Sequence, residues 1–289
     1  GQYKGTYTIP VYANLTYKLY SAGSKLSFYG FTFEGRNDAE VTNITFADEK
    51  VKTLCVAKWD TNNDQKLSLT EAAAVTTLGE TFKGNEEITS FDELRFFTGL
   101  TDISGWDVFY NCNALTSVTI PATVTSLDGA TFAGCSALEQ ISVDPGNTVY
   151  CTRQNGNAII EKATNKLVVG NKTGEIPDGV TVIGADAFHG RHQLQWIGIP
   201  ESVTELENGA FSWCTGLEGV EIPSSVQKIG GWAFTGTSLW GVTLPEGLTT
   251  IGESAFEGCN NLYEVTVQNQ KPLALQNAAT FSNRANATL

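Results

Sequence analysis

The chain has 289 residues, which is enough for one large domain or two smaller ones. Its net charge is −13, its isoelectric point is about 4.6, and only 18 residues are lysine or arginine. Nucleic acid and anionic membrane surfaces are therefore poor partners, because both require a basic face. No apolar run reaches the roughly 18 residues that span a bilayer. Because the chain starts at Gly1, we expect that a targeting segment has been removed.

Residues 1–48 are predicted to be β-rich, because apolar and polar residues alternate in segments 6–9, 15–20 and 25–28. One interpretation is a cap over the open end of a repeat domain, which would otherwise expose an apolar cross-section. The other is the end of a separate β domain. Residues 49–99 are predicted to be helical, with helices at 51–59, 71–78 and 86–97.

A twelve-residue stretch between the first two predicted helices matches the calcium loop of an EF-hand. Calcium takes six to eight oxygen ligands, and this spacing would place them around one point. The candidate ligands are Asp60, Asn62, Asp64, the Lys66 carbonyl and Glu71. Leu67, at position eight, would pack beneath the loop.

One position of this loop departs from the pattern. Position six is usually glycine because the backbone there has a positive φ. In this chain it is Gln65, and a residue other than glycine in that conformation is strained by about 1 kcal/mol. We expect a structural Ca²⁺. The alternative is a loop that caps a helix without metal.

From about Leu100 onward the sequence repeats the phrase Leu-x-x-Val-x-Ile-Pro-x-x-Val-x-x-Ile-x-x-x-Ala-Phe-x-x-Cys-x-x-Leu. A period of 22 to 23 residues predicts a leucine-rich repeat solenoid, in which short parallel strands stack about 4.8 Å apart. The recurring phenylalanines, which would fill the core opposite the strands, are Phe132, Phe188, Phe211, Phe234 and Phe256. The period breaks at about 144–175, where segments 150–153 and 158–161 around Asn155-Gly156 predict an inserted hairpin. Residues 281–289 resemble the start of one more, atypical repeat.

Four cysteines, Cys112, Cys135, Cys214 and Cys259, share one position of the repeat. Arg191 and Thr237 stand at that position in other repeats, so we expect buried free thiols there, not disulfides. Cys55 and Cys151 lie outside the pattern, and the sequence does not pair them.

Exposed aromatics beside glycines on the outward side of the strands are the candidate ligand-binding surface, because they leave a flat apolar floor. Trp196, for example, could lie across Gly219. The candidate binding residues are Trp196, Glu218, Glu221, Trp240, Tyr263 and Glu264. The alternative is that scattered aromatics merely cover neighbouring glycines. Trp213 and Trp232, on the other side of each repeat, are interpreted as packing residues.

The sequence shows no convincing arrangement of catalytic residues. His189 and His192 lie in one turn without an adjacent acidic partner, and no nucleophile elbow or phosphate-binding glycine loop is present. We therefore predict that the protein is not an enzyme and that both histidines are surface polar residues.

The repeated phrase resembles the BspA-type leucine-rich repeat of bacterial surface proteins, and the stretch from Trp59 to Leu94 is also similar to chains of that family. The resemblance covers roughly residues 45–289 and implies an exported, often surface-anchored protein of gut or oral anaerobes that acts as an adhesin or interaction module. The departures are Arg191 and Thr237 in the cysteine position and one residue fewer between Phe234 and Leu239.

Together these observations predict an α+β protein with a β-rich N-terminal cap (1–48), a helical EF-hand-like segment (49–99) and a solenoid (100–289). The expected function is non-enzymatic, extracellular binding of a host protein or glycan by a monomer, through the sheet face. The alternative is a structural spacer of a cell-surface protein with no ligand of its own. The sequence leaves open whether a lipid anchor was present.

Overall fold

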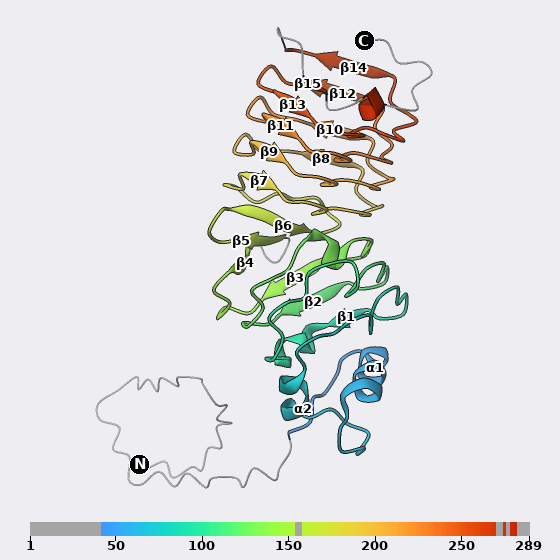
Figure 1. Cartoon of the computed structure of the whole chain (residues 1–289). Helices are drawn as coiled ribbons and strands as arrows, with labels where there is room; N and C mark the ends of the chain where they lie inside the picture. Colours follow the sequence, from blue (N-terminus) through green and yellow to red (C-terminus); the bar gives the residue numbers. More distant parts are fainter. Residues whose placement is uncertain (1–41, 154–157, 270–273, 276–277, 282–289) are drawn as a thin grey trace, which may run out of the picture. The chain divides into compact units, whose positions relative to one another are not determined.

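The computed structural model describes residues 42–153, 158–269, 274–275 and 278–281. These residues form a stack of short strands and turns that follows a helical segment, as Figure 1 shows, so the predicted leucine-rich repeat solenoid is confirmed. The β-rich cap predicted for residues 1–48 lies almost entirely outside the described residues.

The helical segment contains two helices, α1 (Glu49–Trp59) and α2 (Leu69–Ala74). Asp48 caps α1 by accepting hydrogen bonds from the Lys50 and Val51 amides. Ser68 and Glu71 form a reciprocal capping box at the start of α2. The third predicted helix, 86–97, is wrong: it is replaced by strand β1 (Ser90–Phe91) and a 3-10 turn, η1 (Asp92–Phe96).

Helix α1 closes one end of the hydrophobic core. The Trp59 ring lies 5.6 Å from that of Phe97 and 6.2 Å from that of Phe82, and Val51 of α1 is fully buried. The Asp48 carboxylate also accepts hydrogen bonds from the amide and hydroxyl of Thr89, at 2.6 and 2.7 Å. Side chains of the helical segment therefore shield the first turn of the solenoid.

The strands of the solenoid lie on two sides of the stack (Figure 1). On one side, short parallel ladders join β1–β2–β3, β8–β10 and β12–β14. On the other side, an eight-stranded sheet runs in the order β15-β13-β11-β9-β7-β6-β5-β4. The bounds of the first set are β2 (Ser117–Ile120), β3 (Gln140–Val143), β8 (Trp196–Gly198), β10 (Gly219–Glu221), β12 (Gly241–Leu244) and β14 (Glu264–Val267). Those of the second set are β4 (Tyr150–Arg153), β5 (Ala158–Glu161), β6 (Lys166–Gly170), β7 (Val182–Ile183), β9 (Glu205–Leu206), β11 (Lys228–Ile229), β13 (Thr250–Ile251) and β15 (Ala274–Leu275). Two further 3-10 turns are η2 (Gly129–Phe132) and η4 (Ala278–Phe281).

The phenylalanines align in a column, as the repeat predicts. Neighbouring rings stack with centroids 5.1 to 5.4 Å apart, in two runs: Phe82, Phe109 and Phe132, then Phe188, Phe211, Phe234, Phe256 and Phe281. Phe82 belongs to this column, so the stacking begins one turn before the boundary expected at residue 100. At the other end, Phe281 confirms that a further repeat begins there, and residues 282–289 lie outside the described residues.

The cysteines of the repeat are buried, as predicted. Cys112, Cys135 and Cys214 are free thiols, and each Sγ donates to the carbonyl of the phenylalanine in the preceding turn at 2.9 to 3.0 Å. The Sγ of Cys259 donates to the Phe234 carbonyl at 3.1 Å. Burial raises the pKa of the Cys214 thiol to about 12, so this cysteine stays protonated at neutral pH.

The inserted hairpin interrupts the column between Phe132 and Phe188. Strands β4 and β5 pair antiparallel, which confirms the hairpin, and its tip, 154–157, lies outside the described residues. The sequence did not predict β6, which pairs with β5 and then joins β7 in parallel. Gly170, at the end of β6, sits directly against the Phe188 ring.

Arg191 fills the core at this interruption. Its side chain is fully buried and donates to the carbonyls of Phe132 at 2.9 Å, Gly170 at 3.1 Å and His189 at 3.2 Å. No carboxylate in the described part of the chain forms an ion pair with it. The guanidinium therefore links the two runs of the phenylalanine column through hydrogen bonds alone.

Candidate functional site: a groove on the sheet face

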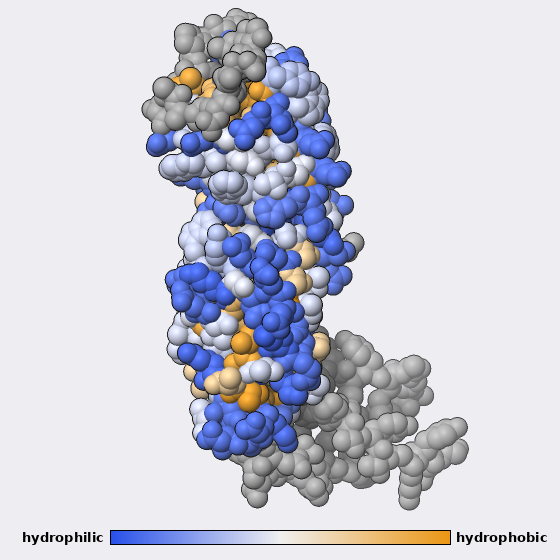
Figure 2. All heavy atoms as spheres, turned by 90° about the vertical axis from the view of Figure 1, so that its right-hand side faces the viewer, coloured by the Kyte–Doolittle hydropathy of each residue, from blue (hydrophilic) through white to orange (hydrophobic). Residues whose placement is uncertain are grey.

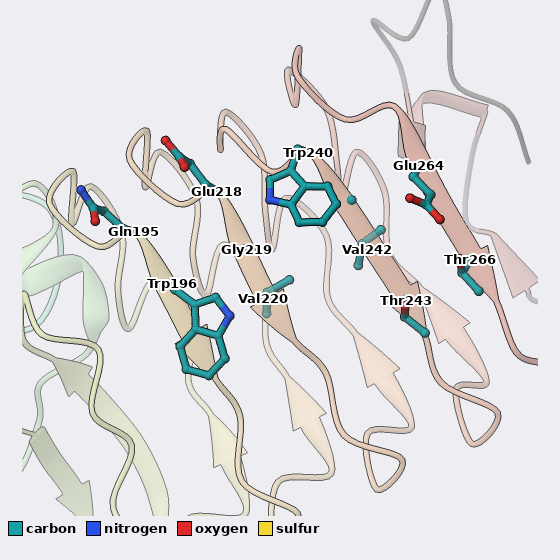
Figure 3. A pocket seen from close by; sticks show the side chains of 11 residues that line it. Gln195, Trp196, Glu218, Gly219, Val220, Trp240, Val242, Thr243, Glu264 and Thr266 are labelled. Carbon is teal, nitrogen blue, oxygen red and sulfur yellow. The ribbon is translucent and has the colours of Figure 1, made fainter.

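A groove of about 550 Å³ lies across strands β8, β10, β12 and β14 (Figure 3). It is lined by Gln195, Trp196, Glu218, Gly219, Val220, Trp240, Gly241, Val242, Thr243, Glu264 and Thr266. In Figure 2 the side of the molecule that carries these strands is largely hydrophilic, with paler side chains gathered in its upper part.

The groove arises from the register of the repeat. Trp196 pairs with Gly219, and Gly241 pairs with Glu264, so these four residues occupy one position in four successive turns. The two glycines in the middle carry no side chain and leave a hollow between Trp196 and Glu264. A side chain built at Gly241 would meet nothing closer than 3.8 Å, which shows that this part of the floor is open.

The two tryptophans are exposed, Trp196 by 60% and Trp240 by 50%. The Trp196 ring lies over Gly198 and Gly219, as predicted, because a Cβ at either glycine would come within 2.9 Å of it. Trp240 stands at the start of β12, and Figure 3 shows β10 and Val220 between the two indoles. Tyr263 stacks on Trp240 at 5.9 Å.

The ladder is open beneath the groove. Strands β8 and β10 pair over three residues and β12 and β14 over four, but β10 and β12 form no ladder with each other. Among the described residues, one backbone hydrogen bond links these two turns here, from the Trp240 amide to the Glu218 carbonyl at 3.3 Å. This gap falls at the turn between Phe234 and Leu239, which is one residue shorter than its counterparts.

Four of the six predicted binding residues line this groove: Trp196, Glu218, Trp240 and Glu264. The other two are nearby, since Glu221 pairs with Gly198 on the same face and Tyr263 packs on Trp240. Val220 and Val242 also line the groove and were not predicted. Their position in the repeat is that of an inward residue. Val242 is buried, whereas Val220 is partly exposed beside the open ladder.

The predicted calcium loop adopts a compact helix–loop–helix arrangement. Asp60 accepts hydrogen bonds from the Asn63 amide at 2.7 Å and the Gln65 amide at 2.9 Å. Gln65 has a φ of +66°, the conformation for which position six normally requires glycine. Leu67 is buried beneath the loop, as predicted.

Glu71 reaches back across the loop to its first residues. One carboxylate oxygen accepts from the Thr61 amide and hydroxyl, both at 2.8 Å, and the other from the Ser68 amide and hydroxyl, at 2.9 and 2.8 Å. Burial raises the pKa of Glu71, but these hydrogen bonds outweigh it and lower the pKa to about 2. The carboxylate is thus ionised at neutral pH and held where position twelve must close the loop.

The described residues contain no cluster of three or more His, Cys, Asp or Glu side chains arranged for a metal ion. Asp60, Asp64 and Glu71 are three such carboxylates, so they do not converge on one point here, and both Glu71 oxygens are directed at Thr61 and Ser68. The types of oxygen donor in the loop, carboxylate, amide and backbone carbonyl, are those that calcium takes.

A second hollow, of about 380 Å³, lies on the turns that carry the two histidines. Its lining includes Trp106, Tyr110, His189, His192 and Trp213. Trp213 and Trp232 are 53% and 45% exposed. The Trp213 ring nevertheless packs over Gly236, where a Cβ would come within 2.8 Å of it. Both have positive φ, 57° and 56°. The position of Trp213 is glycine in neighbouring turns, whereas that of Trp232 is Gly209 in one turn and Asp186 or Ser254 in others.

His189 has an acidic neighbour, contrary to the sequence interpretation. Its Nδ1 lies 3.5 Å from Asp186 Oδ1 and 2.7 Å from Ser212 Oγ. In a catalytic triad the nucleophile and the acid contact opposite nitrogens of the imidazole, whereas here both contact the same one. Ser212 is also buried. These three residues therefore do not form a catalytic triad.

Within the described residues, neither helix is long and apolar enough to cross a bilayer. A family model described as "BspA type Leucine rich repeat region" matches residues 61–165 and 168–287, in six copies. A comparison with curated proteins finds no match.

Two solved structures share the fold. One is a leucine rich cell surface protein from Faecalibacterium prausnitzii A2-165, with 23% identity, a TM-score of 0.50, and coverage of 73% of this chain and 65% of that one. The other is the pneumococcal vaccine antigen PcpA, with 17% identity, a TM-score of 0.50, and coverage of 58% and 49%. This chain thus spans about two thirds and about half of these proteins. Because the family model matches most of its length, the chain belongs to the BspA-type leucine-rich repeat family.

Proposed function

We propose that this protein is a non-enzymatic binding module that recognises a host extracellular protein or glycan through its sheet-face groove. The observation that carries the proposal is the pair of exposed indoles, Trp196 and Trp240, beside an open glycine floor. Rigid, exposed aromatics are the residues that most often anchor a partner. Solenoids commonly bind along such a repeated surface.

We also propose that the protein is displayed at the cell exterior. Support comes from the membership of the BspA-type family and from two proteins of the same fold, one named a cell surface protein and the other a vaccine antigen. An acidic surface suits this location, because its net charge of −13 keeps the protein soluble.

Removing either indole is expected to weaken ligand binding about tenfold or more, the loss typical of an aromatic anchor. The variants are Trp196→Ala and Trp240→Ala, tested by surface plasmon resonance against a panel of extracellular matrix proteins and host glycans. The melting temperature should change little, because both side chains are at least half exposed. Trp232→Ala is the control, since it removes an exposed tryptophan that does not line the groove.

A complementary variant, Gly241→Val, fills the groove without removing any group. Its Cβ has room, and valine suits a strand, so folding should be preserved while binding is lost. Loss of binding in Trp232→Ala but not in the groove variants would contradict the proposal. A panel without any saturable binding would favour the alternative, a structural spacer.

We further propose that the loop from Asp60 to Glu71 holds a structural Ca²⁺. Asp60, Asn62 and Asp64 would supply side-chain oxygens, Lys66 its carbonyl, and Glu71 two carboxylate oxygens. Bound calcium would join the ends of α1 and α2, which stabilises the segment that shields the first turn of the solenoid.

Calcium is expected to raise the melting temperature, since a ligand present at 100 times its Kd adds about 2.7 kcal/mol. Gln65→Gly should raise the melting temperature both with and without calcium, because glycine adopts the positive φ of +66° without strain. Glu71→Gln should abolish the calcium-dependent shift, although glutamine still serves the capping box. Thermal unfolding of the chelated protein, with and without millimolar calcium, checks this. No shift in either the native protein or Gln65→Gly would remove the metal proposal.

A further inference from the structure

The carboxylates of the groove have no counter-ion among the residues that the structure describes. Glu218 and Glu264 line the groove, Glu221 lies beside it, and no lysine, arginine or histidine is among the lining residues. None of the three carboxylates forms an ion pair with any residue that the structure describes. By contrast, Glu205 and Glu207, on the opposite sheet, are paired with Lys228 and Lys166.

The same repeat position elsewhere shows what these carboxylates can hold. Glu139 stands one residue after Leu138, as Glu218 stands one residue after Leu217, so the two glutamates are equivalent. The Glu139 carboxylate forms a salt bridge with Lys172, whose Nζ lies 2.7 Å from Oε2 of Glu139. Lys172 follows the inserted hairpin, which has no counterpart next to Glu218. The position of Glu218 therefore suits an ammonium group, which no residue in the described part of the chain supplies there.

The indoles and the floor complement a cation with an aliphatic stem. The faces of exposed tryptophans attract ammonium and guanidinium groups. The open floor at Gly241 and the partly exposed side chain of Val220 offer apolar contact to the methylene groups of lysine or arginine. A neutral glycan would use the indoles but would leave both carboxylates without a partner of opposite charge.

From this arrangement we infer that the groove binds a basic, extended segment of a partner protein through lysine or arginine side chains. The inference rests on the proposed function of the groove and specifies its ligand. Glu218 and Glu264 stand two turns apart, about 10 Å at the usual strand spacing. A chain in the extended polyproline II conformation rises about 3.1 Å per residue with three residues per turn, so basic residues three positions apart lie on one side of it, about 9 Å apart, and match this distance.

The test uses the full chain and a blocked eight-residue Gly/Ser peptide that carries two lysines three positions apart. Binding is followed by isothermal titration calorimetry. Acetylating both lysines removes their charge and should weaken binding about tenfold or more, whereas trimethylation keeps the charge and the attraction to the indoles. Raising the ionic strength from about 0.05 M to about 0.5 M should also weaken binding.

The variant Glu218→Gln/Glu264→Gln should weaken binding of the lysine peptide about fivefold or more. The control is Glu246→Gln/Glu253→Gln, which removes the same net charge from exposed positions outside the groove and should leave binding within about twofold. Glutamine is nearly isosteric with glutamate, so the melting temperatures of both double variants should stay close to that of the native protein.

Equal binding of the acetylated peptide, or equal losses in the two double variants, would overturn the inference. It would also fail if a glycan bound in a manner that depends on Trp196 and Trp240 while the lysine peptide did not bind. In that case the proposed function would still stand. If neither glycans nor peptides nor matrix proteins bound the groove, both the inference and the proposed function would be overturned.

Discussion

Replacing Arg191 by alanine is expected to lower the free energy of unfolding by about 3 to 5 kcal/mol. The side chain is fully buried, and its removal would take one hydrogen-bond donor from each of the carbonyls of Phe132, Gly170 and His189. The Phe132 and His189 carbonyls would keep a backbone donor, the amides of Cys135 and Gly134. It would also open a cavity between the two runs of the phenylalanine column. Urea denaturation followed by circular dichroism measures the loss.

The form of the transition should change as well. Repeat units are stabilised by their neighbours, so weakening one junction reduces the cooperativity between the segments on either side. We expect the unfolding of Arg191→Ala to broaden or to separate into two steps. A single transition with an unchanged midpoint would contradict the role assigned to Arg191.

Thr237→Cys is the matched control for this variant. Thr237 occupies the same repeat position in a turn without an insertion, and its hydroxyl donates to the carbonyl of Phe234 at 2.9 Å. Cysteine is the usual residue at this position, so the change should stay within about 1 kcal/mol. A large loss here would show that the position is sensitive in every turn and that Arg191 is not special.

Gly170→Ala is expected to destabilise the protein by about 1 to 3 kcal/mol or more, because it overpacks the same junction. A Cβ at Gly170 would lie 2.0, 2.3 and 2.5 Å from three atoms of the Phe188 ring. That ring is fully buried and stacks on Phe211 at 5.1 Å, so it has little room to move. The midpoint of thermal or urea unfolding reports the effect.

Gly241→Ala serves as the comparison for Gly170→Ala. Its Cβ would have only ordinary contacts, at 3.8 Å, so stability should be unchanged or slightly improved. Similar losses in both variants would show that the cost comes from replacing any strand glycine and not from the contact with Phe188.

Much of the fold could be predicted from the repeat alone. The phenylalanine column, the buried cysteines and the inserted hairpin follow from residues that recur at fixed spacing or flank a turn signal. The predicted helix at 86–97 failed because its apolar residues serve the first turn of the stack. Phe91 lies on β1, which pairs with β2, and this parallel pairing outweighs local helix propensity.

The candidate site was predicted in part. The outward position of Trp196 follows from strand alternation, because side chains point to opposite faces in turn. Trp240 stands one repeat position earlier, just before β12, so alternation does not account for its exposure. The partial exposure of Val220 did not follow, since its position is normally an inward one. It depends on the open ladder between β10 and β12, where neighbouring turns no longer hydrogen-bond in register.

The sequence by itself determined that the chain is a solenoid and which residues face inward and outward. The physical reason is that each short unit cannot bury its apolar side alone, so a fixed period requires stacking. Only the tertiary structure decided which charges are paired. Glu139 meets Lys172 because the insertion brings that lysine to it, whereas Glu218, at the same repeat position, lies in the groove with no cation among its lining residues. Contacts between different turns create this difference, and the periodicity of a single turn does not encode it.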